Sequence, residues 1–152
     1  MEIFRIDPAA RLLVSGEIDD WAAVRAHRVD TVVDMDGDVD PGLPEGPSEM
    51  MYVHFPIRDE ALPSLRKLDA LGRLVADLVE TDHVVLVHCR MGFNRSMLVA
   101  STALSYLGWV GTEILTHMRQ VRPGALFNER FADHVKALPA RRIRLERIRE
   151  VT

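Results

Sequence analysis

The chain contains one cysteine, Cys89, among its 152 residues. A single cysteine excludes an internal disulfide framework, and it excludes zinc sites built from four cysteines. A lone cysteine is then either a small buried hydrophobic residue or a reactive thiol. The residues around Cys89 have to decide between these two roles.

Positive charge is also scarce. Lysine and arginine together number 19 against 23 acidic residues, which gives a formal net charge of −4. Proteins that bind nucleic acid through its phosphates usually carry a basic excess, so nucleic acid is an unfavoured partner. Only Lys67 and Lys136 are lysines. The other basic residues are arginines, whose planar side chain is well suited to holding a phosphate.

Long apolar segments are missing as well. No stretch approaches the roughly 18 apolar residues of a membrane span. The first eight residues include acidic side chains and no apolar run, so they do not resemble a secretory signal. We therefore expect a cytoplasmic protein without a membrane span.

The sequence has no convincing pattern of metal ligands. Its six histidines are scattered, without the paired spacing that zinc enzymes use. The acidic run from Asp34 to Asp40 partly matches a calcium-binding loop, but Val39 stands where that loop needs glycine. We expect this run to be a solvated loop, and we expect neither a metal nor a cofactor.

Hydrophobic periodicity predicts strands that alternate with helices. Short apolar runs predict strands at residues 3–6, 12–14, 29–33, 51–55 and 83–88. Apolar residues at three- and four-residue spacing predict helices at about 20–27, from 63 onward, and at about 95–107, 112–121, 128–137 and 141–149. The leucine stripe of the second of these helices, beginning at Leu65, is expected to face the core. Such alternation is typical of an α/β domain with a mainly parallel sheet, here one domain over residues 1–152.

The segment after the predicted strand at 83–88 carries the clearest chemical signal. Cys89 ends this strand, where open α/β sheets place their ligands, and Arg95 opens the next helix. Backbone N–H groups at a helix N-terminus form a nest for an anion, and Gly92 allows the tight turn that closes it. A thiol in such a place favours its thiolate form, and an arginine can hold two phosphate oxygens. We predict a nucleophile at the bottom of a phosphate-binding cup.

The motif His88-Cys89-x5-Arg95-Ser96 resembles the active-site signature of the protein tyrosine phosphatase superfamily. The short chain resembles its compact dual-specificity branch over about residues 29–131. Downstream residues that also match are Val121-Arg122-Pro123, Asn128 and Phe131. The resemblance implies an α/β fold with a central, mainly parallel sheet of four to five strands, flanked by helices on both faces. It also implies hydrolysis of phosphate esters without a metal.

The resemblance assigns roles to three residues of the motif. Cys89 would attack phosphorus and form a cysteinyl-phosphate, while Arg95 and the backbone N–H groups of residues 90–95 would stabilise the transferring group. Ser96 would donate a hydrogen bond to the sulfur, helping the thiolate leave when water hydrolyses the intermediate.

The other residues of the motif are expected to support or line the cup. Adjacent strand residues point to opposite faces, so His88 is predicted to hydrogen-bond the loop instead of accepting the Cys89 proton. Substrate-binding residues are expected between the nucleophile and the arginine, namely Arg90, Met91, Gly92, Phe93 and Asn94. Met91 and Asn94 depart from the resembled pattern, which has smaller residues there. The Phe93 ring either contacts an aromatic substrate or packs under the loop.

A leaving group needs a proton, so a carboxyl group has to reach the cup from a loop at the carboxyl end of a strand. Asp82 is excluded because it precedes the catalytic strand. Asp59 follows the strand at 51–55 and lies 30 residues before Cys89, a separation that the resemblance also implies. Asp59 is the predicted general acid, with Glu60 and the acidic residues Asp34, Asp36 and Asp38 as open alternatives.

The predicted reaction is hydrolysis of phosphotyrosine, with phosphoserine and phosphothreonine as further substrates. Phosphorylated proteins or small phosphate esters are the expected partners. An RNA 5′-triphosphatase stays open because Gly92-Phe93-Asn94-Arg95 is similar to the loop of capping-enzyme triphosphatases. A phosphoinositide or small phosphate-ester phosphatase stays open too, although Arg90 is the loop's one extra cation.

Two further classes are disfavoured. A non-catalytic phosphate-binding module would usually lack Cys89 or Arg95, and both are present. A sulfurtransferase also uses a cysteine loop at a helix start, but the resemblance around Asp59 and Arg122-Pro123 argues against it.

Overall fold

The computed structural model describes residues 1–43 and 48–141, and within them five strands form one sheet. The strand order is β1-β2-β5-β3-β4, and β1 runs antiparallel to β2 while the other neighbours pair in parallel. The bounds are β1 Ile3–Arg5, β2 Leu12–Ser15, β3 Thr31–Asp34, β4 Met51–His54 and β5 Val85–His88. The predicted α/β class with a mainly parallel sheet is confirmed.

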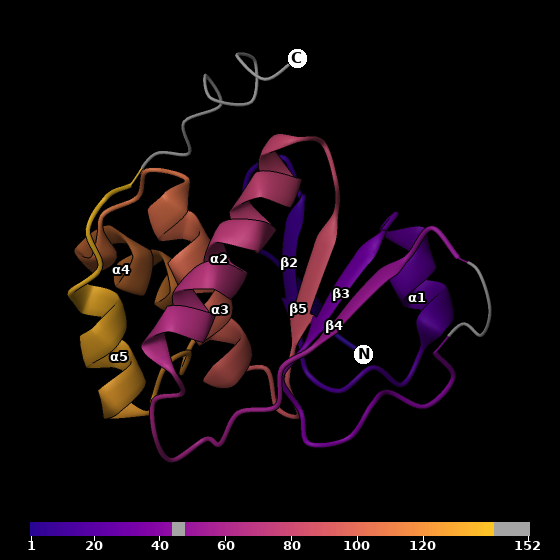
Figure 1. The fold of residues 1–152 in the computed structure, drawn as a ribbon, viewed down its shortest axis with the longest axis horizontal. Helices are drawn as coiled ribbons and strands as arrows, with labels where there is room; N and C mark the ends of the chain where they lie inside the picture. Colours follow the sequence, from indigo (N-terminus) through magenta and orange to yellow (C-terminus); the bar gives the residue numbers. More distant parts are fainter. Residues whose placement is uncertain (44–47, 142–152) are drawn as a thin grey trace.

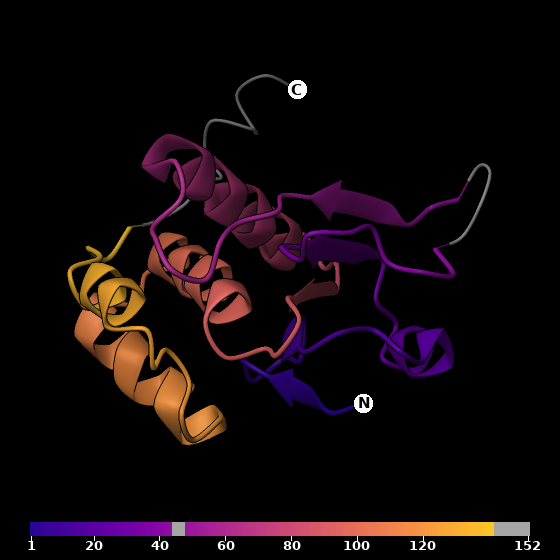
Figure 2. The ribbon, with the colours of Figure 1, turned by 90° about the horizontal axis from the view of Figure 1, so that it is seen from below.

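Helices cover the two faces of the sheet unequally (Figures 1 and 2). The short α1 (Trp21–Ala26) lies on one face, and four longer helices lie on the other. These are α2 Leu65–Glu80, α3 Arg95–Tyr106, α4 Gly111–Val121 and α5 Glu129–Lys136. Because both faces are covered, every residue of β2, β3 and β5 is buried, as expected for central strands of a parallel sheet.

Capping side chains set the starts of three helices. Asp20 accepts hydrogen bonds from the amides of Ala22 and Ala23 at the start of α1. Ser64 accepts one from Lys67 at the start of α2, and Asn128 accepts two at the start of α5. These side chains satisfy amides that have no partner inside the helix.

The stripe expected along α2 is only partly correct. Leu68 and Leu71 are buried, but Leu65 is 51% exposed because the first turn extends beyond the core. The helix approaches α3 closely at Gly72, where an added Cβ would lie 2.4 Å from Cγ2 of Thr102. The absence of a side chain at Gly72 therefore lets α2 support α3, whose N-terminus faces the candidate site.

The predicted terminal helix at 141–149 lies, apart from Arg141, outside the described residues. Among the helices of the described part, none has the length and apolar character needed to cross a membrane.

Candidate active site

The sulfur of Cys89 lies at the bottom of the loop that joins β5 to α3. Cys89 is 2% exposed, and the amide of Gly92 donates a hydrogen bond to its sulfur at 3.2 Å. The hydroxyl oxygen of Ser96 lies 3.4 Å from the same atom. Gly92 has a φ of +72°, a left-handed conformation that glycine adopts without strain. The loop thus bends around the sulfur, and it directs hydrogen-bond donors toward it.

Arg95, the first residue of α3, brings a cation to this loop. One of its terminal nitrogens lies 3.4 Å from the carbonyl oxygens of Met35 and Ile57 and 3.7 Å from a carboxylate oxygen of Asp36. These contacts tie the guanidinium to the segments that follow β3 and β4. The Nε atom of Arg95 is buried, and it has no hydrogen-bond partner among the described residues. This leaves an N–H donor available for an oxyanion.

Asp59 lies on the segment after β4 and is tied to the same loop. Its carboxylate accepts a hydrogen bond from the side-chain amide of Asn94 at 3.4 Å. The side chain of Asn128 donates to the backbone carbonyl of Asp59. The side chain of Glu60 is exposed. The backbone carbonyl of Glu60 accepts a hydrogen bond from Nη1 of Arg130 at 3.4 Å. The structure thus brings the predicted acid, Asp59, together with the loop.

The loop side chains take different positions. Arg90 is exposed and Met91 is 64% exposed, so both lie at the surface of the loop. Asn94 is buried and joins the Asp59 segment to the backbone amide of Asn128. Asn94 is therefore part of the wall of the site and not of its outer edge.

The ring of Phe93 packs against a neighbouring arginine. The guanidinium carbon of Arg122 lies 3.6 Å from the centre of this ring, and the Phe127 ring lies 5.9 Å from it. Phe127 is 64% exposed. Sequence reasoning missed both Arg122 and Phe127 as neighbours of the loop, since only the fold brings residues 122–127 beside it.

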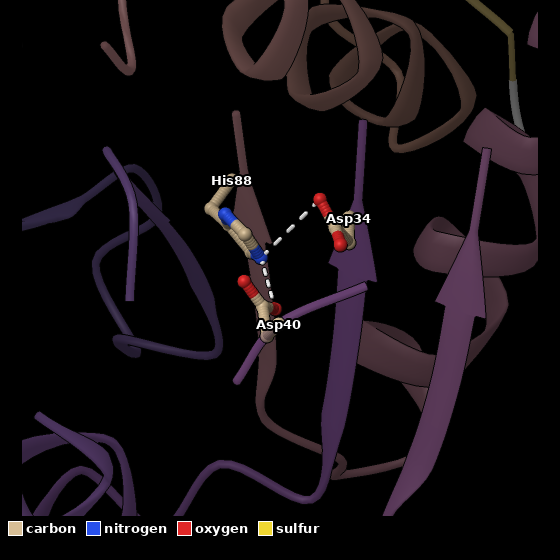
Figure 3. A group of neighbouring side chains, drawn as sticks. All are labelled: Asp34, Asp40 and His88. Carbon is tan, nitrogen blue, oxygen red and sulfur yellow. Dashed lines mark hydrogen bonds and ion pairs between the residues drawn. The ribbon is translucent and has the colours of Figure 1, made fainter. Parts of the chain in front are cut away.

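The acidic run after β3 differs from the predicted solvated loop. Asp36 is half-buried and Asp38 is exposed, but Asp34 is fully buried and Asp40 is 7% exposed. Figure 3 shows Asp34 at the end of β3, next to His88 at the end of β5, with Asp40 reaching in from the following loop. Asp34 is thereby buried away from solvent, which argues against it as the general acid.

Hydrogen bonds explain how two carboxylates tolerate this burial. His88 donates from Nε2 to Asp40 at 2.7 Å, and the same nitrogen lies 3.6 Å from Asp34 (Figure 3). The hydroxyl of Tyr52 donates to Asp34. His88 thus pairs with the acidic loop, a partner that the sequence did not predict. Its ring also interacts with the backbone of Cys89, the first residue of the loop for which the sequence predicted a contact.

The pKa values within this cluster are shifted by its burial and charges. Burial alone would lower the pKa of His88, but the hydrogen bond and charge of Asp40, with the charge of Asp34, raise it overall. Burial and the hydrogen bond to Asp34 raise the pKa of Tyr52. The cluster therefore favours a protonated imidazole between two carboxylates.

The same three residues are the metal-ligand group that the described part of the chain offers. One atom each from Asp34, Asp40 and His88 lies within 4.8 Å of the others. Their hydrogen bonds to one another and to Tyr52 already use these atoms. These contacts hold the three residues together as a hydrogen-bonded ion pair, in which Nδ1 of His88 is buried and has no hydrogen-bond partner among the described residues.

Comparison with solved structures identifies the fold. The chain is similar to DUSP15, with a TM-score of 0.74, 17% identity, and coverage of 88% of this chain and 85% of that one. It is similar to the Yvh1 phosphatase domain from Chaetomium thermophilum, with a TM-score of 0.72, 22% identity and coverage of 89% and 94%. Tk-PTP in its active form gives a TM-score of 0.69 at 27% identity, with coverage of 88% and 95%. No curated protein matches the chain by sequence.

The fold and the cysteine loop define a cysteine-dependent phosphatase of the compact dual-specificity class. The family model Tc-R-P, described as "Polymorphic toxin system, DSP-PTPase phosphatase", matches residues 12–112, and the chain belongs to this family. The predicted class of enzyme, a protein-tyrosine or dual-specificity phosphatase, is thereby confirmed.

Proposed function

We propose that the chain hydrolyses phosphotyrosine and related phosphate monoesters through a cysteinyl-phosphate on Cys89. The observation that carries this proposal is that a buried sulfur and a buried cation donor lie on one loop. The sulfur accepts a hydrogen bond from the Gly92 amide, and Nε of Arg95 has no hydrogen-bond partner in the part of the chain that the structure describes. A nucleophile and an oxyanion donor on one short loop are the minimum that phosphoryl transfer requires.

The first step transfers the phosphoryl group to sulfur. The thiolate of Cys89 forms the S–P bond while the P–O bond to the leaving group breaks. The carboxyl group of Asp59 gives its proton to the leaving oxygen. Arg95 and the loop amides hold the other phosphate oxygens, whose charge they stabilise in the transition state.

The second step returns the enzyme to its starting state. Water attacks phosphorus, the carboxylate of Asp59 takes a proton from it, and the S–P bond breaks to release inorganic phosphate. Ser96 donates a hydrogen bond to the sulfur as negative charge returns to it. The 3.4 Å separation of the two side-chain atoms supports this role.

The surface beside the loop favours an aromatic phosphate ester. Met91 and Phe127 expose apolar side chains, and the half-buried Phe93 ring lies next to Phe127. An aromatic ring on the substrate would bury apolar area against them, and an aliphatic phosphoserine side chain would bury less. We therefore place phosphotyrosine ahead of phosphoserine and phosphothreonine.

A substrate panel with EDTA present tests this function. Phosphotyrosine and phosphoserine peptides, phosphoinositides and triphosphate-ended RNA are compared by phosphate release. The expected result is highest kcat/KM for phosphotyrosine, and complete loss of turnover in Cys89→Ser. Preferential hydrolysis of RNA ends or phosphoinositides would contradict the proposed substrate, and full activity of Cys89→Ser would contradict the mechanism.

A further inference from the structure

The peptide units of the phosphate-binding loop are held from outside. The carbonyl of Arg90 accepts a hydrogen bond from the Glu17 amide at 2.9 Å, and that of Phe93 accepts one from the Leu126 amide at 2.8 Å. The carbonyl of Met91 accepts one from Nη1 of Arg122 at 2.7 Å. Three carbonyls of the loop therefore have partners on its outer side.

An outward carbonyl fixes an inward amide. The C=O and N–H of one trans peptide unit point in opposite directions, and the described residues contain no cis peptide bonds. The unit that joins Met91 to Gly92 follows this rule, because its carbonyl faces Arg122 and its N–H donates to the sulfur of Cys89 at 3.2 Å. The direction of the Gly92 donor is thus coupled to the position of the Arg122 guanidinium.

Arg122 is itself firmly held. Its guanidinium carbon lies 3.6 Å from the centre of the Phe93 ring and 4.7 Å from that of Phe4. A Cβ added to Gly92 would lie 2.7 Å from Nη1 of Arg122, so the guanidinium packs directly against this glycine. Stacking on two rings restricts the guanidinium to one orientation.

Of the three groups that donate to these loop carbonyls, only the Arg122 guanidinium belongs to a side chain. Glu17 and Leu126 donate through their backbone, which substitution does not remove. Burial lowers the pKa of Arg122, and the negative charges of Glu2 and Cys89 oppose this shift.

We propose that Arg122 is a positioning residue of the phosphate-binding loop. By holding the Met91 carbonyl on the outer side, it keeps the Gly92 amide directed at the sulfur and at a bound oxyanion. Its role in this proposal runs through that backbone unit. The inference deepens the proposed function and rests on it for its catalytic meaning, but its structural content concerns oxyanion binding alone.

Binding of tungstate, measured by titration calorimetry, tests the proposal without turnover. Arg122→Met removes the donor and keeps much of the apolar stem, and it should weaken tungstate binding about tenfold, the loss expected when one well-aligned donor is misdirected. Arg122→Lys keeps a charged donor but cannot stack as a planar group, so it should recover part of this loss. In ¹H–¹⁵N spectra the Gly92 amide resonance should move in Arg122→Met and respond less to tungstate.

Arg141→Met is the matched control. The Arg141 guanidinium also stacks on a ring, that of Tyr106, at 4.8 Å, but at the opposite end of α3 from the loop. This variant should bind tungstate as the wild type does. Thermal unfolding of all variants separates loss of fold from loss of positioning.

Tungstate affinity within twofold of the wild type in Arg122→Met would overturn the proposal, as would an unmoved Gly92 resonance. If Arg122→Met does not fold, Arg122→Lys decides, and affinity and Gly92 resonance both equal to the wild type would overturn it. A wild-type chain that binds tungstate but hydrolyses no phosphate ester would instead contradict the proposed function and leave the positioning role standing.

Discussion

The hydroxyl oxygen of Ser96 lies 3.4 Å from the sulfur of Cys89, and both residues are buried. The hydroxyl can therefore stabilise the thiolate as it leaves phosphorus, a step that belongs to hydrolysis of the intermediate. We predict that Ser96→Ala lowers kcat about tenfold, equivalent to about 1.4 kcal/mol. Formation of the intermediate should be less affected, so stopped-flow records with p-nitrophenyl phosphate should show a burst of product.

Ser101 provides the control for that variant. It is a buried serine on the same helix, and its hydroxyl has no hydrogen-bond partner among the described residues. Ser101→Ala should keep the wild-type kcat and show no new burst. A burst-free, fully active Ser96→Ala would show that its hydroxyl does not assist the leaving thiolate.

The carboxylate of Asp59 should matter most for poor leaving groups. We predict that Asp59→Asn lowers kcat/KM by about 1,000-fold for an alkyl phosphate, whose leaving oxygen needs the proton. For p-nitrophenyl phosphate, whose leaving group is stable as an anion, the loss should be about tenfold. The measurement is the dependence of kcat/KM on leaving-group pKa in wild type and variant.

Asp36→Asn is the comparison for Asp59→Asn. Of the alternative acids Asp34, Asp36 and Asp38, Asp36 is the one whose carboxylate pairs with Arg95, with 3.7 Å between Oδ1 and Nη1. Any decrease in kcat/KM of Asp36→Asn should be the same for all leaving groups. A leaving-group dependence that steepens in Asp36→Asn and not in Asp59→Asn would assign the acid to Asp36.

The pair of His88 with Asp40 should make stability depend on pH. Asp40 and Asp34 raise the pKa of His88 in the folded chain, against the opposing effect of burial. The unfolded chain has the ordinary histidine pKa of about 6.5. The stabilisation is therefore complete below about pH 6.5, and it is lost as pH rises through the higher folded pKa.

Asp40→Asn tests this linkage. We predict that it lowers the free energy of unfolding by about 3 kcal/mol at pH 6, since one partner of a buried ion pair is removed. The difference in free energy of unfolding between Asp40→Asn and the wild type should become smaller as pH rises above about 6.5. Urea denaturation at several pH values measures the difference, with Asp38→Asn, on the exposed part of the same loop, as the control. A deficit that grows with pH would contradict the assignment.

The contact between α2 and α3 predicts an effect on stability. In Gly72→Ala the new Cβ would lie 2.4 Å from Cγ2 and 2.7 Å from Cβ of Thr102. Overpacking of this kind should lower the free energy of unfolding by about 1–3 kcal/mol in urea denaturation. Gly37→Ala is the control because no atom of the described residues lies within 4 Å of its added Cβ. Equal stability of the two variants would contradict the close packing.

Local patterns were sufficient to predict most of the fold and the cysteine loop. The strands at 12–14 and 51–55 and the helix that begins at Arg95 follow from periodicity and capping, which depend on neighbouring residues. The burial of Asp34 and Asp40 could not be predicted, because it depends on a partner, His88, about 50 residues away. The same holds for Arg122, whose contact with Met91 exists only once α4 has packed beside the loop.

The covalent intermediate is the central claim, and the single cysteine makes its test direct. Asp59→Asn, mixed with p-nitrophenyl phosphate and quenched in acid within milliseconds, is analysed by intact mass and peptide mapping. The account predicts one added phosphoryl group, located on the peptide that contains Cys89 and absent from Cys89→Ser. Turnover without any phosphoryl-enzyme, or a phosphoryl group on another residue, would contradict it.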